Sequence, residues 1–499
     1  MVRVRFAPSP TGPLHIGGVR TALYNFLFAK KNKGVFLLRI EDTDQKRYVD
    51  FAEEYIKKSL DWCNIKYDEG VDIEGEKGPY RQSERKEIYK RYVKQLIKKG
   101  HAYYAFDTKE ELEEMRENLK KAGVASPKYD SIMREQMKNS LTLPKEEVEK
   151  RLSESQQYVV RVKIPRNKEI KLKDIIRGWV VVNSNTLDDK VIFKSDGMPT
   201  YHLANVVDDH LMGITHVIRG EEWLPSAPLH VMLYDFFGWN DKMPEFAHLP
   251  LILRPDGKGK LSKRDGDKHG FPVFPLRYKT DEGEVEGFKD SGFLSSAFVN
   301  MLAFLGWNPG TEKEIFNLEE LIDSFSLERV SKSGAKFDFE KTKWFNQQHI
   351  RLLNNKSIYE IIKQDFVDHK EEKIIKIIEL EKERVLFLSD IVSNSKIYFT
   401  GLKINYKDYL LKKPKKEIKD ILCAILESMI NINDFKKENI EKIIREYIDF
   451  KNLKFGELLP LLRFALTGEK RGPSIYSIIE IIGKDIFKKR INNFLKNVE

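Results

Sequence analysis

The chain has 499 residues, which is too long for one hydrophobic core and indicates several domains. Hydrophobic residues make up 41% and charged residues 33% of the sequence. This composition excludes wholesale disorder, and no apolar stretch approaches the roughly 18 residues that a membrane span needs. Lys and Arg number 87 against 77 Asp and Glu, a net charge of +10 that suits a phosphate-bearing partner without requiring one.

The start of the chain and its cysteine content bear on the cellular compartment. Residues 2–6 already have a strand pattern, so we expect no signal or transit peptide, no membrane attachment and a cytoplasmic location. The two cysteines, Cys63 and Cys423, are too few for a disulfide framework or a four-thiolate zinc site. Both have apolar neighbours, and we expect each to be a small buried side chain.

The first forty residues predict a βαβ unit. A strand at 2–6 is followed by a loop at 7–13 that is rich in proline and glycine. Apolar residues then recur at helical spacing between 16 and 27, and a continuous apolar run occupies 35–40. Such a run is typical of a strand buried in a parallel sheet.

The rest of the chain divides into segments that differ in composition and in secondary-structure pattern. A second amphipathic helix is expected to begin at Ser83. Residues from about 105 to 160 are rich in Lys and Glu, which indicates an insertion, and strand signals return at 158–162 and 179–182. Beyond about residue 330 the pattern is wholly helical and rich in Ile and Lys, so the sequence predicts an α/β half followed by a helical half.

The loop at 9–18 is a candidate phosphate site because it joins a buried strand to a helix N-terminus. Unpaired backbone N–H groups and the positive end of the helix dipole favour phosphates at such a position. Gly17 and Gly18 lack a Cβ, so a purine could lie against the first helical turn. His15 can donate hydrogen bonds to a phosphate oxygen as charge develops there. Alone, this signal is weak, because glycine-rich turns into helices are common.

The segment Lys-Leu-Ser-Lys-Arg at 260–264 is a second candidate, and it follows two glycines, Gly257 and Gly259. Two lysines and an arginine on a glycine-hinged loop make a mobile cationic clamp, suited to a pentavalent phosphorus with a leaving pyrophosphate. Taken alone, the segment is more simply explained as an exposed basic loop.

Together, these two segments resemble the paired signatures of class I aminoacyl-tRNA synthetases. In that class the two loops close around ATP while the carboxylate of the amino acid attacks the α-phosphate. Further motifs extend the resemblance along nearly the whole chain, to the bacterial-type glutamyl-tRNA synthetases. These motifs occupy residues 5–12, 38–44, 79–85, 201–210, 217–223, 337–338 with Trp344 and Asn346, and 460–468.

The resemblance implies a fold class: an α/β Rossmann-type catalytic domain with an insertion, followed by an all-α C-terminal half. On this basis the two halves of the catalytic domain are expected at 1–104 and 191–250, with the acceptor-end insertion at 105–190 between them. A stem-contact region with the lysine-rich loop is expected at 251–330. An α-helical anticodon-binding region is expected at 331–499.

The resemblance also implies site residues. The catalytic groups would be His15, Lys260 and Lys263. The ATP contacts would be Thr11, His15, Gly17, Gly18, Trp223, Lys260, Ser262, Lys263 and Arg264. The glutamate contacts would be Arg5, Ala7, Ser9, Glu41, Tyr201 and Arg219.

The chemistry of several of these residues supports the assignment, with alternatives. Arg219 offers a fork of donors for a carboxylate, and Glu41, at the carboxyl end of a strand, would accept the ammonium group of glutamate. The acidic run at 41–44 could instead cap a helix, and we expect Thr43 or Asp44 to do so. An ordinary core indole is an equally good interpretation of Trp223.

Two departures from related sequences affect the expected cofactors. Gly18 stands where other class I signatures carry a second His, as is usual for the glutamyl branch. Many relatives carry a zinc site in the insertion, but residues 100–107 contain no Cys, so we expect no structural zinc and no protein-bound metal. Mg²⁺ is expected to accompany ATP.

The function implied by the resemblance is ATP-dependent attachment of L-glutamate to tRNA(Glu) through glutamyl-adenylate, by an enzyme that is usually monomeric. Adenylate formation would require bound tRNA, and transfer would go to the 2′-hydroxyl. A glutaminyl-tRNA synthetase would carry β-barrels after the catalytic domain, and a glutamyl-queuosine synthetase would lack the helical half. A catalytically inactive RNA-binding module is the remaining alternative. Whether tRNA(Gln) is also charged stays open.

Overall fold

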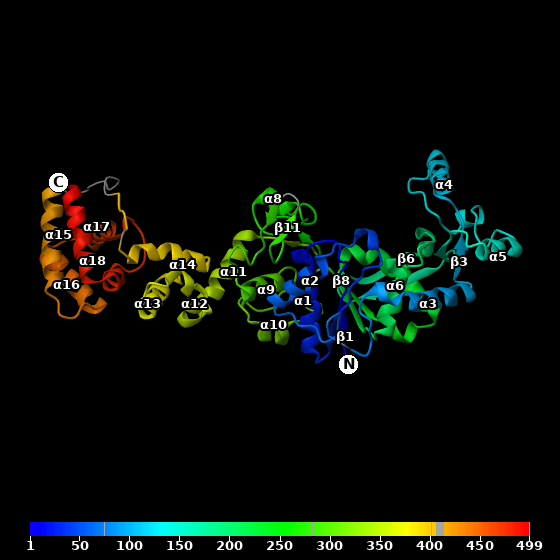
Figure 1. Cartoon of the computed structure of the whole chain (residues 1–499), viewed down its shortest axis with the longest axis horizontal. Coiled ribbons are helices and arrows are strands. Elements are labelled where there is room, and N and C mark those ends of the chain that lie inside the picture. Colours follow the sequence, from blue (N-terminus) through cyan, green and yellow to red (C-terminus); the bar gives the residue numbers. More distant parts are fainter. Residues whose placement is uncertain (74, 281–282, 401, 406–413, 499) are drawn as a thin grey trace. The chain divides into compact units, whose positions relative to one another are not determined.

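The computed structural model describes residues 1–499 apart from 74, 281–282, 401, 406–413 and 499. This described part of the chain divides into two compact units (Figure 1). Unit 1 comprises Met1–Ser291 and Ser295–Thr342, and unit 2 comprises Gly292–Leu294 and Lys343–Glu499.

Unit 1 opens with the predicted βαβ unit. Strands β1 (Arg3–Phe6) and β2 (Val35–Leu38) pair in parallel, with helix α1 (Ile16–Lys31) between them. The side of α1 that packs on the strands is apolar at helical spacing, and Val19, Leu23 and Leu27 are fully buried there. This arrangement brings the loop between β1 and α1 to the carboxyl ends of the strands, where ligands gather in open parallel sheets.

A second sheet, of four strands, lies beside β1. Strands β8 (His216–Gly220) and β9 (Glu245–Leu249) pair in parallel, and β5 (Glu169–Asp174) joins β9 as the inner strand of a hairpin with β6 (Gly178–Asn183). The backbone N–H of Thr215 donates to the carbonyl of Arg3 over 2.9 Å, which ties the start of β8 to β1. The predicted Rossmann-type α/β architecture is therefore confirmed.

Helices α2 (Ala52–Trp62), α3 (Lys86–Lys98), α6 (Tyr201–Leu211) and α7 (Ala227–Phe237) also belong to unit 1. The prediction that Ser83 opens α3 was wrong. The chain forms a 3-10 turn before α3, and the Ser83 backbone N–H donates to Oδ1 of Asp42 over 2.8 Å instead.

The inserted segment builds its own small antiparallel sheet from β3 (Ala102–Ala105), β4 (Val159–Val162) and β7 (Val191–Phe193), in that order. Helices α4 (Lys109–Lys121) and α5 (Lys145–Ser153) accompany it (Figure 1, cyan). Thr108 and Glu111 form a reciprocal capping box at the start of α4, as the sequence pattern Thr-x-x-Glu favours.

The remainder of unit 1 carries the lysine-rich loop. Its strands and helices are β10 (Ile252–Leu253), α8 (Asp265–His269), β11 (Tyr278–Thr280), β12 (Gly283–Val285), α9 (Ser295–Ala303), α10 (Leu318–Ser324) and β13 (Ala335–Lys336). Short β13 pairs in parallel with β10, so the chain beyond residue 330 is not wholly helical as predicted. Helix α11 (Phe339–Leu352) runs across the boundary between the units.

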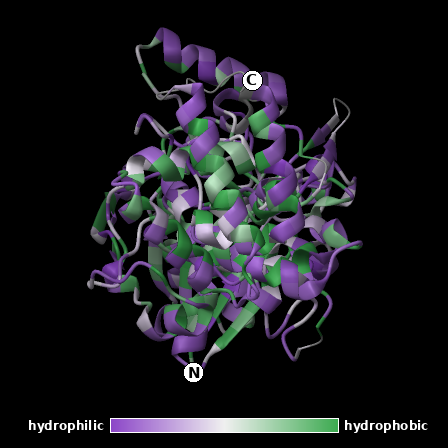
Figure 2. Cartoon of the chain, turned by 90° about the vertical axis from the view of Figure 1, so that its left-hand side faces the viewer, coloured by the Kyte–Doolittle hydropathy of each residue, from purple (hydrophilic) through white to green (hydrophobic). Residues whose placement is uncertain are grey.

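Unit 2 is built from helices around a core rich in isoleucine. Its helices after α11 are α12 (Asn355–Ile362), α13 (Glu371–Glu381), α14 (Leu388–Ser395), α15 (Lys415–Ile430), α16 (Lys437–Phe450), α17 (Phe455–Thr467) and α18 (Ile475–Val498). Hydrophobic and hydrophilic residues alternate along single helices in Figure 2, as expected where each helix buries one face. Every helix or strand among the described residues from 343 on is a helix, so the predicted all-α C-terminal half is confirmed for unit 2.

Short 3-10 turns connect several of these elements. They lie at Gln45–Arg47, Gln82–Arg85, Met133–Glu135, Ser184–Thr186, Glu221–Ser226, Asn240–Lys242, Leu327–Arg329, Lys363–Phe366 and Lys396–Tyr398. Cys63 is fully buried as predicted, whereas Cys423 is only half-buried at the edge of the core of unit 2. Among the described residues, no helix is both long enough and apolar enough to cross a membrane.

Candidate active site

His15 occupies the N-cap position of α1 and is held in one orientation by its own turn. Its Nδ1 accepts a hydrogen bond from the backbone N–H of Gly17 over 3.2 Å, so the neutral ring carries its proton on Nε2. Nε2 is buried and makes no hydrogen bond within the described residues. Burial, together with the charges of Lys263 and Lys260, lowers the pKa of His15 to about 4. At neutral pH the ring is therefore uncharged, and the backbone of Ser262 in the lysine-rich loop is the polar group that favours its proton.

The lysine-rich loop is anchored on both sides of its turn. Lys260 forms an antiparallel bridge with Leu253 of β10, and Leu261, which is buried, donates its backbone N–H to the carbonyl of Ile252. Gly257 and Gly259 turn the chain with φ of 76° and 86°, a region that favours glycine. The glycines thus shape a tight turn, and the backbone of the loop is more constrained than the predicted mobile hinge.

The two signature segments line one cavity. Its volume is about 360 Å³, and its walls include His15, Gly17 and Gly18 from one segment and Lys260 to Lys263 from the other. The Nζ of Lys260 lies 2.7 Å from Oε1 of Glu222, which also lines the cavity. Arg264, an expected ATP contact, does not line this cavity.

A second cavity of about 400 Å³ adjoins the first and shares Gly17, Gly18, Thr21, Gly220 and Glu222 with it. Every residue expected to contact glutamate lines this second cavity. They are Arg5, Ala7, Ser9, Glu41, Tyr201 and Arg219. Thr11 and Trp223, which were expected to contact ATP, lie here too and not in the first cavity.

Arg5 and Glu41 belong to a buried network of charges. Nε and Nη2 of Arg5 donate to the two carboxylate oxygens of Asp209 over 3.0 and 3.3 Å. Arg39 donates to Asp209 over 2.7 Å and to Oε1 of Glu41 over 3.0 Å, and Asn205 donates to the same Glu41 oxygen. Burial raises the pKa of Glu41, against the opposing effect of Arg39 and Arg5.

Tyr201 and Arg219 form another part of the wall of the second cavity. Nη1 of Arg219 donates to the hydroxyl of Tyr201 over 2.7 Å, which leaves the hydroxyl proton of Tyr201 free to donate elsewhere. The indole of Trp223 lies 4.4 Å from the ring of Tyr201, centroid to centroid, and 42% of Trp223 is exposed. This exposure excludes the interpretation of Trp223 as a core indole.

The acidic run at 41–44 caps no α-helix, but Asp44 stands at the N-cap position of a 3-10 turn. Its carboxylate accepts from Nε of Arg47 over 2.6 Å, and a hydrogen bond from the backbone of Lys46 also lowers its pKa. Asp42 accepts from the backbone of Ser83. Within the described ranges, no group of three or more His, Cys, Asp or Glu side chains is arranged to hold a metal ion.

Three residues of this site had no role in the prediction from sequence: Arg39, Asn205 and Asp209. A signal for two of them was available. Tyr201, Asn205 and Asp209 recur every four residues, a spacing that places them on one face of α6. Arg39 directly follows β2, two residues before Glu41, and no such repeat distinguishes it.

The comparisons with known proteins agree with this geometry. A family described as "tRNA synthetases class I (E and Q), catalytic domain" matches residues 1–344, and one described as "Anticodon binding domain" matches residues 349–495. The fold and the paired cavities thus define a class I tRNA synthetase.

Relatives of similar length narrow the assignment. Glutamate–tRNA ligases of Cytophaga hutchinsonii and Christiangramia forsetii are each 53% identical to this chain over 98% of it, and the matches cover 96% and 98% of those proteins. The crystal structure of a glutamate tRNA ligase from Elizabethkingia meningosepticum in complex with its amino acid has a TM-score of 0.92 and 48% identity over all of both chains. The chain belongs to the glutamate–tRNA ligase family.

Proposed function

We propose that the chain joins L-glutamate to tRNA(Glu) in two steps, with ATP in the first cavity and glutamate in the second. One observation carries this proposal: all the expected glutamate contacts line one cavity, and that cavity shares a wall with the cavity formed by the two signature segments. The shared wall would bring the carboxylate of glutamate next to the α-phosphate of ATP, which the first step requires.

Glutamate is recognised at both of its ends in this proposal. Arg219 and the hydroxyl of Tyr201 receive the side-chain carboxylate, since both can donate to it. Glu41 receives the ammonium group through Oε2, because Oε1 already accepts from Arg39 and Asn205. Arg5 contributes through Nη1, because Asp209 occupies its Nε and Nη2.

ATP is held by the other cavity. Gly17 leaves room for the purine against α1, whereas a Cβ at Gly18 would clash with Leu14. The first turn of that helix favours the phosphates. Lys260 and Lys263 pair with the phosphate charges. Mg²⁺ arrives with ATP as part of the substrate, consistent with the general use of Mg²⁺ by the family.

The chemical step follows from these positions. An oxygen of the α-carboxylate of glutamate attacks the α-phosphorus, the bond to the β-phosphate oxygen breaks, and pyrophosphate leaves with the electron pair. His15 donates from Nε2 to the phosphate as negative charge develops, and Lys263 stabilises the same charge. The 2′-hydroxyl of the terminal adenosine of tRNA then attacks the glutamyl carbonyl and passes its proton to a phosphate oxygen of the adenylate, which leaves as AMP.

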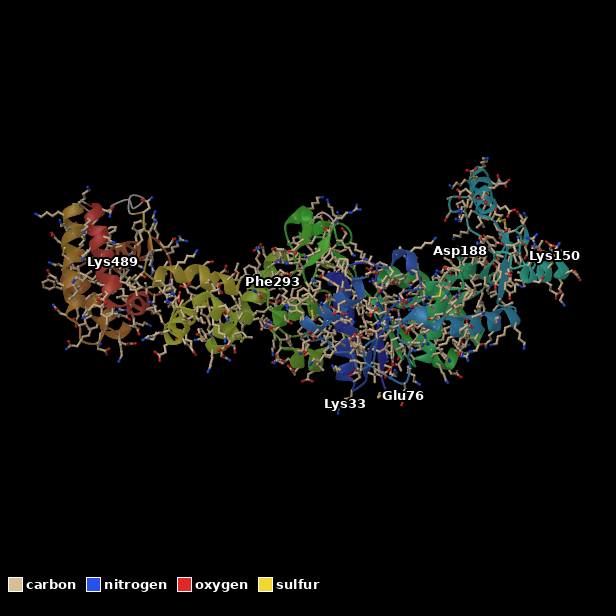
Figure 3. The ribbon with its side chains drawn as sticks, in the orientation of Figure 1. Lys33, Glu76, Lys150, Asp188, Phe293 and Lys489 are labelled. Atoms are coloured by element: carbon tan, nitrogen blue, oxygen red, sulfur yellow. The ribbon has the colours of Figure 1, made fainter. Side chains whose placement is uncertain are left out.

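The tRNA partner suits the charge of the chain. The sequence carries a net charge of +10, and exposed lysines occur in both units, as Lys150 on α5 and Lys489 on α18 illustrate (Figure 3). Unit 2, which matches the anticodon binding domain, is the proposed reader of the anticodon, and the inserted segment is the proposed contact for the acceptor end. The proposal also includes that the protein is a monomer, that it acts in the cytoplasm and that it holds no structural zinc.

Two assays test the proposal with the full chain. Aminoacylation of purified tRNA(Glu) and tRNA(Gln) with labelled glutamate should show charging of tRNA(Glu) and determine whether tRNA(Gln) is also a substrate. ATP–pyrophosphate exchange, run with and without tRNA, should depend on glutamate and on tRNA. If no glutamate-dependent exchange occurs in the presence of tRNA(Glu), the proposal is wrong. The result would then favour the alternative of a catalytically inactive RNA-binding module.

A further inference from the structure

Two histidines that the proposed mechanism does not use bracket the guanidinium of Arg219. Nε of Arg219 lies 3.1 Å from Nε2 of His248, and Nη1 lies 3.4 Å from Nδ1 of His230. A guanidinium has donors and no acceptor, so both ring nitrogens must face it with a lone pair.

The remaining ring nitrogens fix the tautomer of each histidine. Nδ1 of His248 lies 2.6 Å from Oδ2 of Asp174 and carries the proton that it donates there. Nε2 of His230 lies 3.2 Å from Nδ1 of His202 and donates to it in the same way. Both histidines are almost completely buried, and burial lowers the pKa of each, in the case of His230 far below its usual range. Each ring is thus neutral, with one donor and one acceptor, and both are used.

Arg5 and Arg219, which both line the second cavity, therefore differ in charge compensation. Arg5 forms an ion pair with Asp209. Arg219 is 5% exposed, yet within the part of the chain that the structure describes no carboxylate oxygen comes within 4.0 Å of its guanidinium nitrogens. Asp174 is separated from it by the whole ring of His248. A buried cation without a counter-charge is costly, and a bound carboxylate relieves that cost.

We propose that His230 and His248 are positioning residues that fix Arg219 through neutral acceptors, leave its positive charge for the substrate, and so set the preference for glutamate over glutamine. A carboxylate in either place would hold the arginine equally well but would neutralise it. Neutral imidazoles orient the fork without competing for its charge. The inference rests on the proposed contact between Arg219 and the side chain of glutamate.

The test compares two replacements of His230 in the full chain. His230→Gln keeps a neutral acceptor for Arg219, whereas His230→Glu introduces a negative one of nearly the same shape. We expect His230→Glu to raise KM for glutamate, and to lower the ratio of kcat/KM for glutamate to that for glutamine, by about 10- to 100-fold. His230→Gln should keep that ratio within a few-fold of the parent. His216→Gln is the matched control, because His216 lies at the start of β8, the strand that carries Arg219. This control should leave the ratio unchanged.

Equal losses in His230→Gln and His230→Glu, or an unchanged ratio in His230→Glu, would overturn the inference, since a purely structural role does not distinguish charge. ATP affinity and thermal unfolding report whether each variant is folded. If His230→Glu does not fold, His248→Gln and His248→Glu provide the same comparison at the other acceptor, with the same criterion.

Arg219→Leu separates this inference from the proposed function. An unchanged KM for glutamate in Arg219→Leu would contradict the proposed contact between Arg219 and glutamate. The inference about the histidines, which rests on that contact, would then fail as well. A raised KM in Arg219→Leu, combined with no difference between Gln and Glu at His230 and at His248, would leave the proposed function standing and overturn the role of the histidines alone.

Discussion

Glutamate and glutamine differ by a single group of nearly the same size, so only charge and hydrogen-bond polarity can separate them at the residue scale. Arginine donors satisfy a carboxylate but face the NH₂ group of an amide with no acceptor. A site built in this way can reject the wrong substrate by roughly 10⁴-fold, because its buried polar groups are left unpaired. A separate editing site is then unnecessary.

Arg219 is the residue on which this discrimination should depend. Arg219→Leu should raise KM for glutamate by roughly 10²-fold or more and leave ATP affinity nearly unchanged, because the substitution removes a charged donor from the substrate carboxylate. Arg219→Lys should recover only part of the loss, since a point charge cannot reproduce the fork. Steady-state kinetics with both amino acids provide the measurement. If Arg219→Leu prefers glutamate as strongly as the parent, Arg5 becomes the discriminating residue.

Lys263 should act mainly on the transition state. If it stabilises charge that develops at the phosphates, Lys263→Ala should lower kcat by about 10²–10³-fold and weaken ATP binding much less. Single-turnover adenylate formation in the presence of tRNA is the measurement, and Lys258→Ala, an exposed lysine of the same loop, is the control. Unchanged single-turnover rates would rule out this role for Lys263.

At the scale of single elements, helix α6 lines the second cavity, the proposed glutamate site, and also stabilises its wall. One face of α6 carries Tyr201, Asn205 and Asp209, and Asp209 bonds both Arg5 and Arg39. Burial alone would raise the pKa of Asp209, but the two arginines hold it below its usual range. The carboxylate therefore stabilises the fold at neutral pH, and that contribution is lost as the pH falls through the lowered pKa.

Removal of this carboxylate should be strongly destabilising. Asp209→Ala leaves Arg5 and Arg39 buried without their shared partner, and we expect the free energy of unfolding to fall by about 3–5 kcal/mol. Urea unfolding followed by circular dichroism measures the loss. Asp241→Ala, at an exposed aspartate, should change stability by less than about 0.5 kcal/mol. Similar values for the two variants would show that the buried network contributes little.

Local patterns were sufficient to predict the βαβ unit and both signature segments, because strand, turn and helix signals there lie within a few residues of one another. The start of α3 was missed because the turn before it depends on Asp42, which is distant in sequence. His248 could not have been linked to Arg219, because their contact follows from the pairing of β9 with β8. The expected glutamate contacts, which line the second cavity, were predicted from family motifs, because such motifs include positions that are distant in sequence.

At the scale of the whole molecule, the division into two units predicts separable tasks. A chain that ends after Thr342 should retain a folded α/β part that binds ATP but charges tRNA poorly. Its tRNA affinity should also fall less steeply with salt than that of the full chain, with a log–log slope smaller by roughly 0.9 for each tRNA phosphate that unit 2 neutralises. Filter binding across a salt series, with the full chain in parallel, tests this. Full charging activity in the shortened chain would show that unit 2 does not read tRNA.

The ion pair between Lys260 and Glu222 has an energetic consequence for the arrival of ATP. Its two side chains are 54% and 41% exposed, and pairs exposed to this extent contribute about 0–1 kcal/mol. A phosphate can therefore displace the carboxylate at little cost. Because the bridge between Lys260 and Leu253 fixes the backbone, the exchange needs only a swing of the four-carbon side chain. In the proposed function, the weakly bound carboxylate of Glu222 thus holds the side chain of Lys260 in place until a phosphate of ATP replaces it.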